Sequence, residues 1–141
     1  MATRTSHAEW RGDLKSGDGD LHLGSGRYSG PYTFVSRFGS GEGGTSPEEL
    51  LAAAHAACFS MALSNQLAQA GTPVESVKTE AAVHVDAGVI FKIELSTVGR
   101  VPGIDEAGFL EQANAAKEGC PVSKLFAGGS AEIMVEAKLE T

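Results

Sequence analysis

The chain of 141 residues is poor in cysteine, with only Cys58 and Cys120, and it contains one tryptophan and five prolines. Two cysteines do not make the disulfide framework of a small secreted protein, and no Cys-x-x-Cys motif indicates a thioredoxin-type site. The N-terminal sequence MATRTSHAEW lacks the apolar core of a signal peptide, and the longest apolar run, 52–63, is too short to span a bilayer. We therefore expect a cytoplasmic protein whose two thiols are reactive, metal-binding or simply buried.

Positive charge is also scarce, because 11 lysines and arginines face 18 aspartates and glutamates and leave a net charge of −7. Such a chain would be repelled by nucleic acid and by anionic membranes, so neither is an expected partner. A composition that is 42% hydrophobic and 21% charged is too apolar for a disordered chain. The length fits one domain rather than two, and we expect a single domain over residues 1–141.

Alternation of apolar and polar residues with a period of two indicates β-strands in several segments. The segments 77–85 and 89–97 alternate on either side of Asp86-Ala87-Gly88, which predicts an antiparallel hairpin with one solvated face. The same pattern returns at 133–139. Shorter strands are expected at 7–14, 20–23 and 32–38. Nine of the 18 glycines lie between Gly17 and Gly44 and indicate turns and loops there.

A long helix is predicted from Ser46 to Ala70. Ser46 is a suitable N-cap, Glu49 follows three residues later to close a capping box, and Gly71 supplies a stop. Ten of the twelve residues at 52–63 are apolar, so this helix must be buried on nearly every side. A single sheet can cover only one side of the helix, so we expect a second copy of the chain to cover the other side.

Two further helices are predicted at 105–118, with Gly119 as the stop, and at 120–126. Together these elements predict an α+β fold with an antiparallel sheet. The glycines at 39–44 match the dinucleotide-binding pattern GxGxxG, but the acidic residue that this pattern needs about 20 positions later is absent. We therefore expect no nucleotide cofactor.

Cys58 and Cys120 are the first candidates for chemistry. Cys58 lies in the middle of the long predicted helix, where a buried cysteine is often only a small apolar residue. The helix dipole does not stabilise a thiolate in the middle of a helix, so a Cys58 thiolate near neutral pH needs a nearby cation. Cys120 is expected at an exposed corner between two helices, an unusual place for a packing cysteine. Such a pair suits an attacking and a resolving thiol, provided the fold brings the two together.

His55 lies three residues before Cys58, on the same face of the predicted helix. It could act as a base for Cys58, or bind a metal together with Cys58 and Cys120. A zinc site needs at least one further ligand, and no spacing in the sequence supplies it. A histidine that packs in the core or at an interface is the third interpretation, and the one we favour.

Arg37 and Glu48 are the candidate charged pair. Arg37 is expected at the end of the strand at 32–38, where it could equally be a plain surface residue. Glu49 has a structural role at the helix start, which leaves Glu48 free to orient a cation. Glu48 precedes Cys58 by ten residues, about 15 Å along a helix that rises about 1.5 Å per residue. If both act through one arginine, we expect them to come from different chains.

Two sequence blocks resemble the osmotically inducible protein C (OsmC) family, which is related to the organic hydroperoxide resistance proteins. The blocks are Thr45-Ser-Pro-Glu-Glu-Leu-Leu-Ala-Ala-Ala-His-Ala-Ala-Cys58 and Lys117-Glu-Gly-Cys120-Pro-Val-Ser-Lys124. Weaker similarity at 8–13 and 101–105 extends the resemblance over most of the chain. His55 is typical of the OsmC branch, whereas the related branch has an aromatic residue at that position.

The resemblance implies a thiol-dependent peroxidase that reduces organic hydroperoxides, and hydrogen peroxide less well, without a metal or an organic cofactor. In the family the helix cysteine attacks the peroxide and the Cys-Pro cysteine resolves the product, which matches Cys58 and Cys120. An external dithiol then reduces the disulfide. A family arginine and glutamate tune the attacking thiol. Glu48 matches that glutamate by its Pro-Glu context, and Arg37 is the preferred arginine. The alternative arginines are Arg11 and Arg27.

The resemblance also implies an intertwined homodimer, in which antiparallel sheets wrap around two central helices. Apolar side chains such as Phe59 and Met61 are then expected to favour substrates with a hydrocarbon arm. The alternative from another class is a non-catalytic dimer. In that protein His55, Cys58 and Cys120 would sense the redox state or bind a metal.

Overall fold

A computed structural model describes residues 1–140 of the chain. These residues form two compact units, of which the first ends at Leu50 and the second begins at Leu51. Each unit holds a three-stranded sheet of its own. The mixture of helices and sheets confirms the predicted α+β class.

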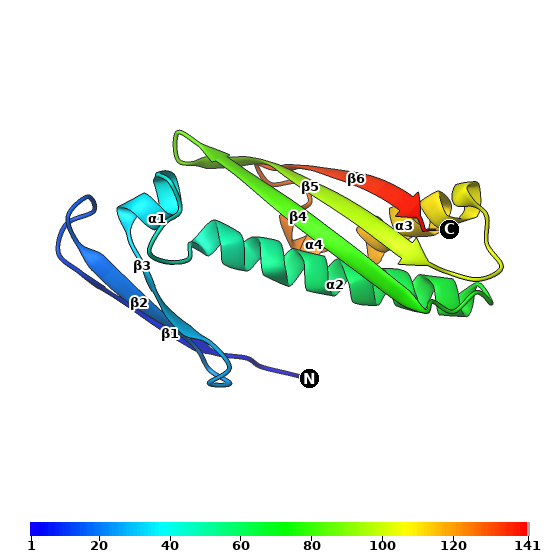
Figure 1. The fold of residues 1–141 in the computed structure, drawn as a ribbon, viewed down its shortest axis with the longest axis horizontal. Coiled ribbons are helices and arrows are strands. Elements are labelled where there is room, and N and C mark those ends of the chain that lie inside the picture. Colours follow the sequence, from blue (N-terminus) through cyan, green and yellow to red (C-terminus); the bar gives the residue numbers. More distant parts are fainter. Residues whose placement is uncertain (141) are drawn as a thin grey trace. The chain divides into compact units, whose positions relative to one another are not determined.

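The first unit begins with strands β1 (Ser6–Arg11), β2 (Asp18–Leu23) and β3 (Ser29–Tyr32), shown in blue in Figure 1. They form an antiparallel sheet in the order β1-β2-β3. The strands expected at 7–14 and 20–23 are therefore present, although the first ends earlier than expected.

The prediction of a strand at 32–38 was wrong, because β3 ends at Tyr32 and helix α1 (Phe34–Phe38) follows. Thr33 and Ser36 form a reciprocal capping box. The N–H of Ser36 donates to Thr33 Oγ1 at 3.1 Å, and the N–H of Thr33 donates to Ser36 Oγ at 2.7 Å. The aromatic residues that suggested alternation, Phe34 and Phe38, instead pack one helical turn apart at a ring distance of 5.3 Å.

In the second unit, strands β4 (Ser76–Asp86) and β5 (Val89–Arg100) form the predicted antiparallel hairpin. Asp86 pairs with Val89, and the two residues between them, Ala87 and Gly88, have φ angles of 49° and 77°. Two positive φ angles are the requirement of the tight turn that matches the twist of paired strands.

The third strand of this sheet, β6 (Glu132–Leu139), pairs with β5 in parallel, so the prediction of a purely antiparallel sheet was wrong. The chain between these strands forms helices α3 (Glu106–Gly119) and α4 (Pro121–Phe126). A connection that contains helices returns the chain to the same end of the sheet, which makes the next strand parallel. Both helices lie where they were predicted, although Gly119 is the last residue of α3 rather than a stop beyond it.

Helix α2 (Pro47–Gln69) confirms the predicted long helix. The N–H of Glu49 donates to Ser46 Oγ at 3.1 Å, but the Glu49 carboxylate accepts from the Thr45 hydroxyl instead of closing the expected capping box. Gly71, with a φ of 87°, follows the last turn and allows the chain to reverse. The helix signals in the sequence were therefore sufficient to place both ends.

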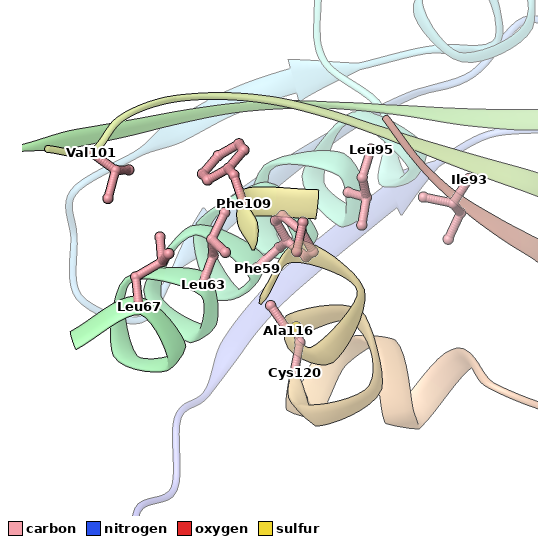
Figure 2. Close-up of a cluster of buried hydrophobic side chains, with 10 residues drawn as sticks. Phe59, Leu63, Leu67, Ile93, Leu95, Val101, Phe109, Ala116 and Cys120 are labelled. Atoms are coloured by element: carbon pink, nitrogen blue, oxygen red, sulfur yellow. The ribbon is translucent and has the colours of Figure 1, made fainter. Parts of the chain in front are cut away.

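The core of the second unit lies between its sheet and the helices that cover one face of it (Figure 1). Figure 2 shows Phe59, Leu63 and Leu67 following one another along α2 at intervals of four residues. They pack with the following buried side chains of β5, α3 and the next helix junction: Ile93, Leu95, Phe109, Ala113, Ala116 and Cys120. Gly99 of β5 permits this packing, because a Cβ there would lie 2.6 Å from the Phe109 ring.

The opposite face of α2 is exposed in the single chain. Met61 retains 75% of its surface, and Ala53, Ala54 and Ala57 are exposed as well. The expectation of burial on nearly every side is thus not met within one chain. Phe59 is fully buried in the core, so it does not line an accessible substrate site as expected, whereas Met61 lies on the exposed face.

Candidate active site

The Arg37 guanidinium is fixed by the Glu48 carboxylate. Arg37 lies in the last turn of α1, and Glu48 lies in the first turn of α2. The Arg37 Nε and Nη2 atoms each donate to a different Glu48 oxygen, both at 2.9 Å, in the two-point geometry that suits these groups. The hydrogen bonds that Arg37 donates to Glu48 raise the pKa of Arg37, so the guanidinium stays charged at every accessible pH.

The alternative arginines have other environments. Arg11, on the exposed β1, donates to the carboxylates of Glu9, Asp18 and Asp20. Arg27 is exposed in the turn between β2 and β3. Of the three candidates, Arg37 is the one that binds Glu48.

A cavity of about 390 Å³ lies beside this ion pair in the first unit. The Arg37 guanidinium forms part of its wall and stacks over the Phe38 ring, 4.7 Å from the ring centre. The remaining wall is mostly apolar and consists of Trp10, Gly12, Leu14, Tyr32, Thr33, Phe34 and Phe38. The cavity therefore combines aromatic surface with one fixed positive charge.

In the second unit, the Sγ atoms of Cys58 and Cys120 lie 2.9 Å apart, although 62 positions separate the two residues in the sequence. Both are free thiols. Cys58 comes from the middle of α2, and Cys120 lies at the junction of α3 and α4. A disulfide bond is about 2.05 Å long, so a shift of about 1 Å would join the two sulfur atoms.

The burial of the two thiols is the reverse of what was expected. Cys120 has no exposed surface, because it packs in the core beside Ala116 (Figure 2), so its predicted position at an exposed corner was wrong. Cys58 is only partly buried. Any reagent that approaches this pair from solvent therefore has access to Cys58 and not to Cys120.

The two thiols have opposite pKa shifts. Burial and the hydrogen bond with Cys120 raise the pKa of Cys58, against a smaller opposing effect of the Val122 N–H. Burial also acts to raise the pKa of Cys120, but hydrogen bonds from Cys58, from the Ser123 N–H and hydroxyl, and from the Val122 N–H together lower it. Within the second unit, the surroundings therefore favour ionisation of Cys120 over ionisation of Cys58.

His55 is fully buried and contacts Ser123 rather than Cys58. Its Nε2 lies 2.7 Å from Ser123 Oγ, and its ring meets the edge of Phe126 at 5.7 Å. Burial lowers the pKa of His55, so the imidazole is neutral near pH 7. This environment is that of a core histidine, and it does not support His55 as a base for Cys58.

No metal-binding arrangement of three or more His, Cys, Asp or Glu side chains occurs within residues 1–140, which leaves the metal site of His55, Cys58 and Cys120 without support.

Ser123 was not singled out from the sequence. The available signal was its position three residues after Cys120, in the first turn of a predicted helix.

Comparisons with known proteins show which family and which relatives the chain is similar to. The OsmC-like protein family matches residues 39–136. The chain is 46% identical over 143 residues to Peroxiredoxin OsmC of Escherichia coli (strain K12), an alignment that covers 98% of this chain and 97% of that protein. It is 36% identical over 105 residues to the organic hydroperoxide resistance protein OhrB of Bacillus subtilis (strain 168), over 71% of each chain.

The fold is also similar to that of solved structures. The crystal structure of OhrB of Bacillus subtilis matches with a TM-score of 0.65 and 27% identity, over 96% of this chain and 98% of that chain. None of the helices in the described part of the chain is long and apolar enough to cross a membrane.

Proposed function

The chain belongs to the OsmC-like protein family and is a peroxidase of the peroxiredoxin type, and from this premise we propose that it reduces organic hydroperoxides to alcohols through Cys58 and Cys120. The observation that carries the proposal is the 2.9 Å distance between the two Sγ atoms. Two thiols from distant parts of the chain, one accessible and one buried, form the pair that a peroxide-reducing disulfide cycle requires. Hydrogen peroxide, which has no apolar arm, is the poorer substrate.

The cycle has three steps. The Cys58 thiolate attacks the distal oxygen of the hydroperoxide, so that an S–O bond forms, the O–O bond breaks, and the alkoxide takes a proton and leaves as the alcohol. The Cys120 thiolate then attacks the sulfur of the Cys58 sulfenic acid, whose hydroxyl takes a proton and leaves as water. An external dithiol reduces the resulting disulfide to two thiols and becomes a disulfide itself. No metal or organic cofactor takes part.

Arg37 and Glu48 supply the activation of Cys58 in this proposal. The surroundings of Cys58 within its own unit raise its pKa, so a thiolate needs a positive charge from elsewhere. The Arg37 guanidinium, held at two points by Glu48, is a charge of that kind. We propose that it lowers the pKa of Cys58 and orients the peroxide.

The substrate class follows from the cavity beside Arg37. Its aromatic wall suits a hydrocarbon arm, and the guanidinium suits the polar peroxide group at the end of that arm. We expect hydrogen peroxide to bind more weakly in this cavity, because it has no hydrocarbon arm to contact the apolar wall. A cavity of about 390 Å³ has room for a small organic hydroperoxide.

Dimerisation is part of the proposal, in the form of an intertwined homodimer whose sheets wrap around the two α2 helices. Met61 and three alanines leave one face of α2 apolar and exposed in the single chain, and a second copy would cover it. We expect light scattering at micromolar concentration to give the mass of two chains, and the thermal midpoint to rise with protein concentration. A folded monomer at that concentration would contradict the dimer. It would also contradict the expectation that Glu48 of one chain and Cys58 of the other act through one arginine.

The peroxidase itself is tested by turnover. Wild-type protein is given tert-butyl hydroperoxide and excess dithiothreitol, and the loss of hydroperoxide is followed over many equivalents per chain. We expect sustained consumption, and a lower rate with hydrogen peroxide at the same concentration. Consumption that stops after one equivalent, with the dithiol still present, would instead favour a redox sensor.

A further inference from the structure

Two of the four histidines of the chain lie against each other on the sheet of the first unit. His7 of β1 and His22 of β2 are direct partners in the antiparallel register. Their ring centres are 4.8 Å apart, and the two ring planes differ by 18°. His7 is exposed and His22 is partly exposed, so solvent reaches both residues. The pair takes no part in the peroxidase cycle described above.

The other two histidines have different partners, and both belong to the second unit. His55 is fully buried and lies 2.7 Å from Ser123 Oγ. His84 of β4 is partly exposed, and its Nε2 lies 2.6 Å from a carboxylate oxygen of Glu94. The contact between two imidazole rings is therefore a particular feature of His7 and His22.

The face of the sheet that carries this pair is negatively charged. Because side chains alternate along a strand, the next two rows on this face hold four charged residues. They pair across the strands as Glu9 with Asp20 and Arg11 with Asp18, whereas the opposite face carries the buried Leu21. Arg11 binds all three carboxylates, which still leaves an excess of negative charge beside the histidines. A field of that sign favours a cation at the pair.

The spacing of the two rings suits a shared metal ion. Imidazole nitrogens bind zinc at about 2.0–2.1 Å, which puts the ring centre about 3 Å from the ion. Two rings on one ion, at an angle of about 90–110°, then have their centres about 4.5–5 Å apart. The observed separation of 4.8 Å lies in that range. The rings need only turn about their Cβ–Cγ bonds to aim one nitrogen each at the ion, and their exposure leaves room for this turn.

Ser29 of β3 supplies the outer partner that a metal-bound histidine usually has. It pairs with His22 in the register, and its Oγ lies 2.8 Å from His22 Nδ1. Metal-bound imidazoles almost always give the proton of their other nitrogen to an acceptor, which orients the ring and fixes its tautomer. An ion at His22 Nε2 selects the arrangement in which Nδ1 donates to Ser29 Oγ. His7, His22 and Ser29 thus form one row across three strands.

We propose that His7 and His22 bind one divalent transition-metal ion, with Ser29 as a positioning residue for His22. Imidazole suits Zn²⁺, Cu²⁺ and Ni²⁺, whereas Ca²⁺ and Mg²⁺ prefer oxygen ligands. Two protein ligands are fewer than a closed site needs, so water fills the remaining positions and the ion exchanges with solvent. The proposal does not rest on the proposed function, since neither histidine lines the cavity beside Arg37.

The first test is calorimetric titration of the untagged protein with NiCl₂ at about pH 7.5, because a metal binds the unprotonated imidazole. We expect His7→Gln and His22→Gln to bind Ni²⁺ at least tenfold more weakly than the wild type, since the second imidazole of a pair binds within the same molecule. Any Ni²⁺ held by the two cysteines contributes equally to all these proteins. The difference between them therefore belongs to the histidine pair.

Two further comparisons control this titration. Ser29→Ala should weaken Ni²⁺ binding about tenfold, as is typical when the outer partner of a metal ligand is lost, whereas Ser29→Thr keeps the hydroxyl and should bind as the wild type does. His84→Gln removes a partly exposed strand histidine of the other sheet and should leave the affinity unchanged. Equal affinity in the wild type and in His7→Gln would overturn the proposal, even if His22→Gln does not fold. A loss confined to His84→Gln would overturn it as well.

The second test locates the ion and needs no variant. Ni²⁺ is paramagnetic and broadens the NMR signals of nearby protons, so a small fraction of an equivalent should broaden the ring signals of His7 and His22 before those of His55 and His84. An ion that joins two strands also stabilises the folded state, and the thermal midpoint should rise by about 5 °C at a hundred times the dissociation constant. Broadening that begins at His84, or that affects His7 and His84 equally, would mean an adventitious ion only and would overturn the proposal.

Discussion

Replacement of Cys58 by serine is expected to lower hydroperoxide turnover to the uncatalysed background, whereas replacement of Cys120 leaves one attack intact. Cys58 is the partly exposed thiol of the pair and the one that a hydroperoxide can reach. In Cys120→Ser the sulfenic acid forms but has no neighbouring thiol, so it persists or is oxidised further. A sulfenic-acid reagent such as dimedone should therefore label residue 58 in Cys120→Ser and leave Cys58→Ser unlabelled.

The two variants serve as each other's control, since each removes one sulfur and retains the other. Turnover with dithiothreitol can continue slowly in Cys120→Ser, because the external dithiol can itself attack the sulfenic acid. It cannot continue in Cys58→Ser. Equal turnover in the two variants would contradict the assignment of unequal roles.

Arg37→Ala is expected to slow the attack on peroxide at pH 7 by about tenfold for each unit by which the pKa of Cys58 rises. Burial already favours the neutral thiol, and the guanidinium is the charge proposed to reverse that preference. Because the thiolate forms unaided at high pH, the deficit should shrink as the pH rises. The measurement is the rate of Cys58 oxidation between about pH 6 and 9, where a free thiol of pKa about 8.5 titrates.

Three control variants sharpen this test. Glu48→Ala should act in the same direction more mildly, because it releases the Arg37 guanidinium without removing it. Arg37→Lys keeps the charge but loses the two-point contact, and should fall between alanine and wild type. Arg11→Ala should match wild type, since Arg11 is bound by three other carboxylates. If Arg11→Ala shows the deficit and Arg37→Ala does not, the choice of arginine is wrong.

The fold was predictable wherever a local signal decided the structure. The capping signal at Ser46 placed the start of α2, and the alternation on both sides of Ala87-Gly88 placed the hairpin. At 32–38 two local signals competed, and the cap at Thr33 outweighed a short alternation of aromatic residues. The parallel pairing of β6 follows from the helices that precede it, a relation between distant segments that strand periodicity does not contain.

The site was predictable in its residue types but not in its environments. The sequence indicated two pairs of residues, Arg37 with Glu48 and Cys58 with Cys120. In the structure the two members of each pair are in contact. The burial of Cys120 was not predictable, because it depends on which neighbours fill the space between α2 and α3. Ser123 was missed for the same reason, since its contact with His55 joins residues 68 positions apart.

The most direct test of the central claim is the intact mass of the wild-type protein after one equivalent of tert-butyl hydroperoxide, followed by peptide mapping. The account predicts a loss of two hydrogen atoms, one molecule of alcohol per chain, and a disulfide that links Cys58 to Cys120 within one chain. An unchanged mass with the hydroperoxide intact would contradict it, as would a disulfide that joins different chains.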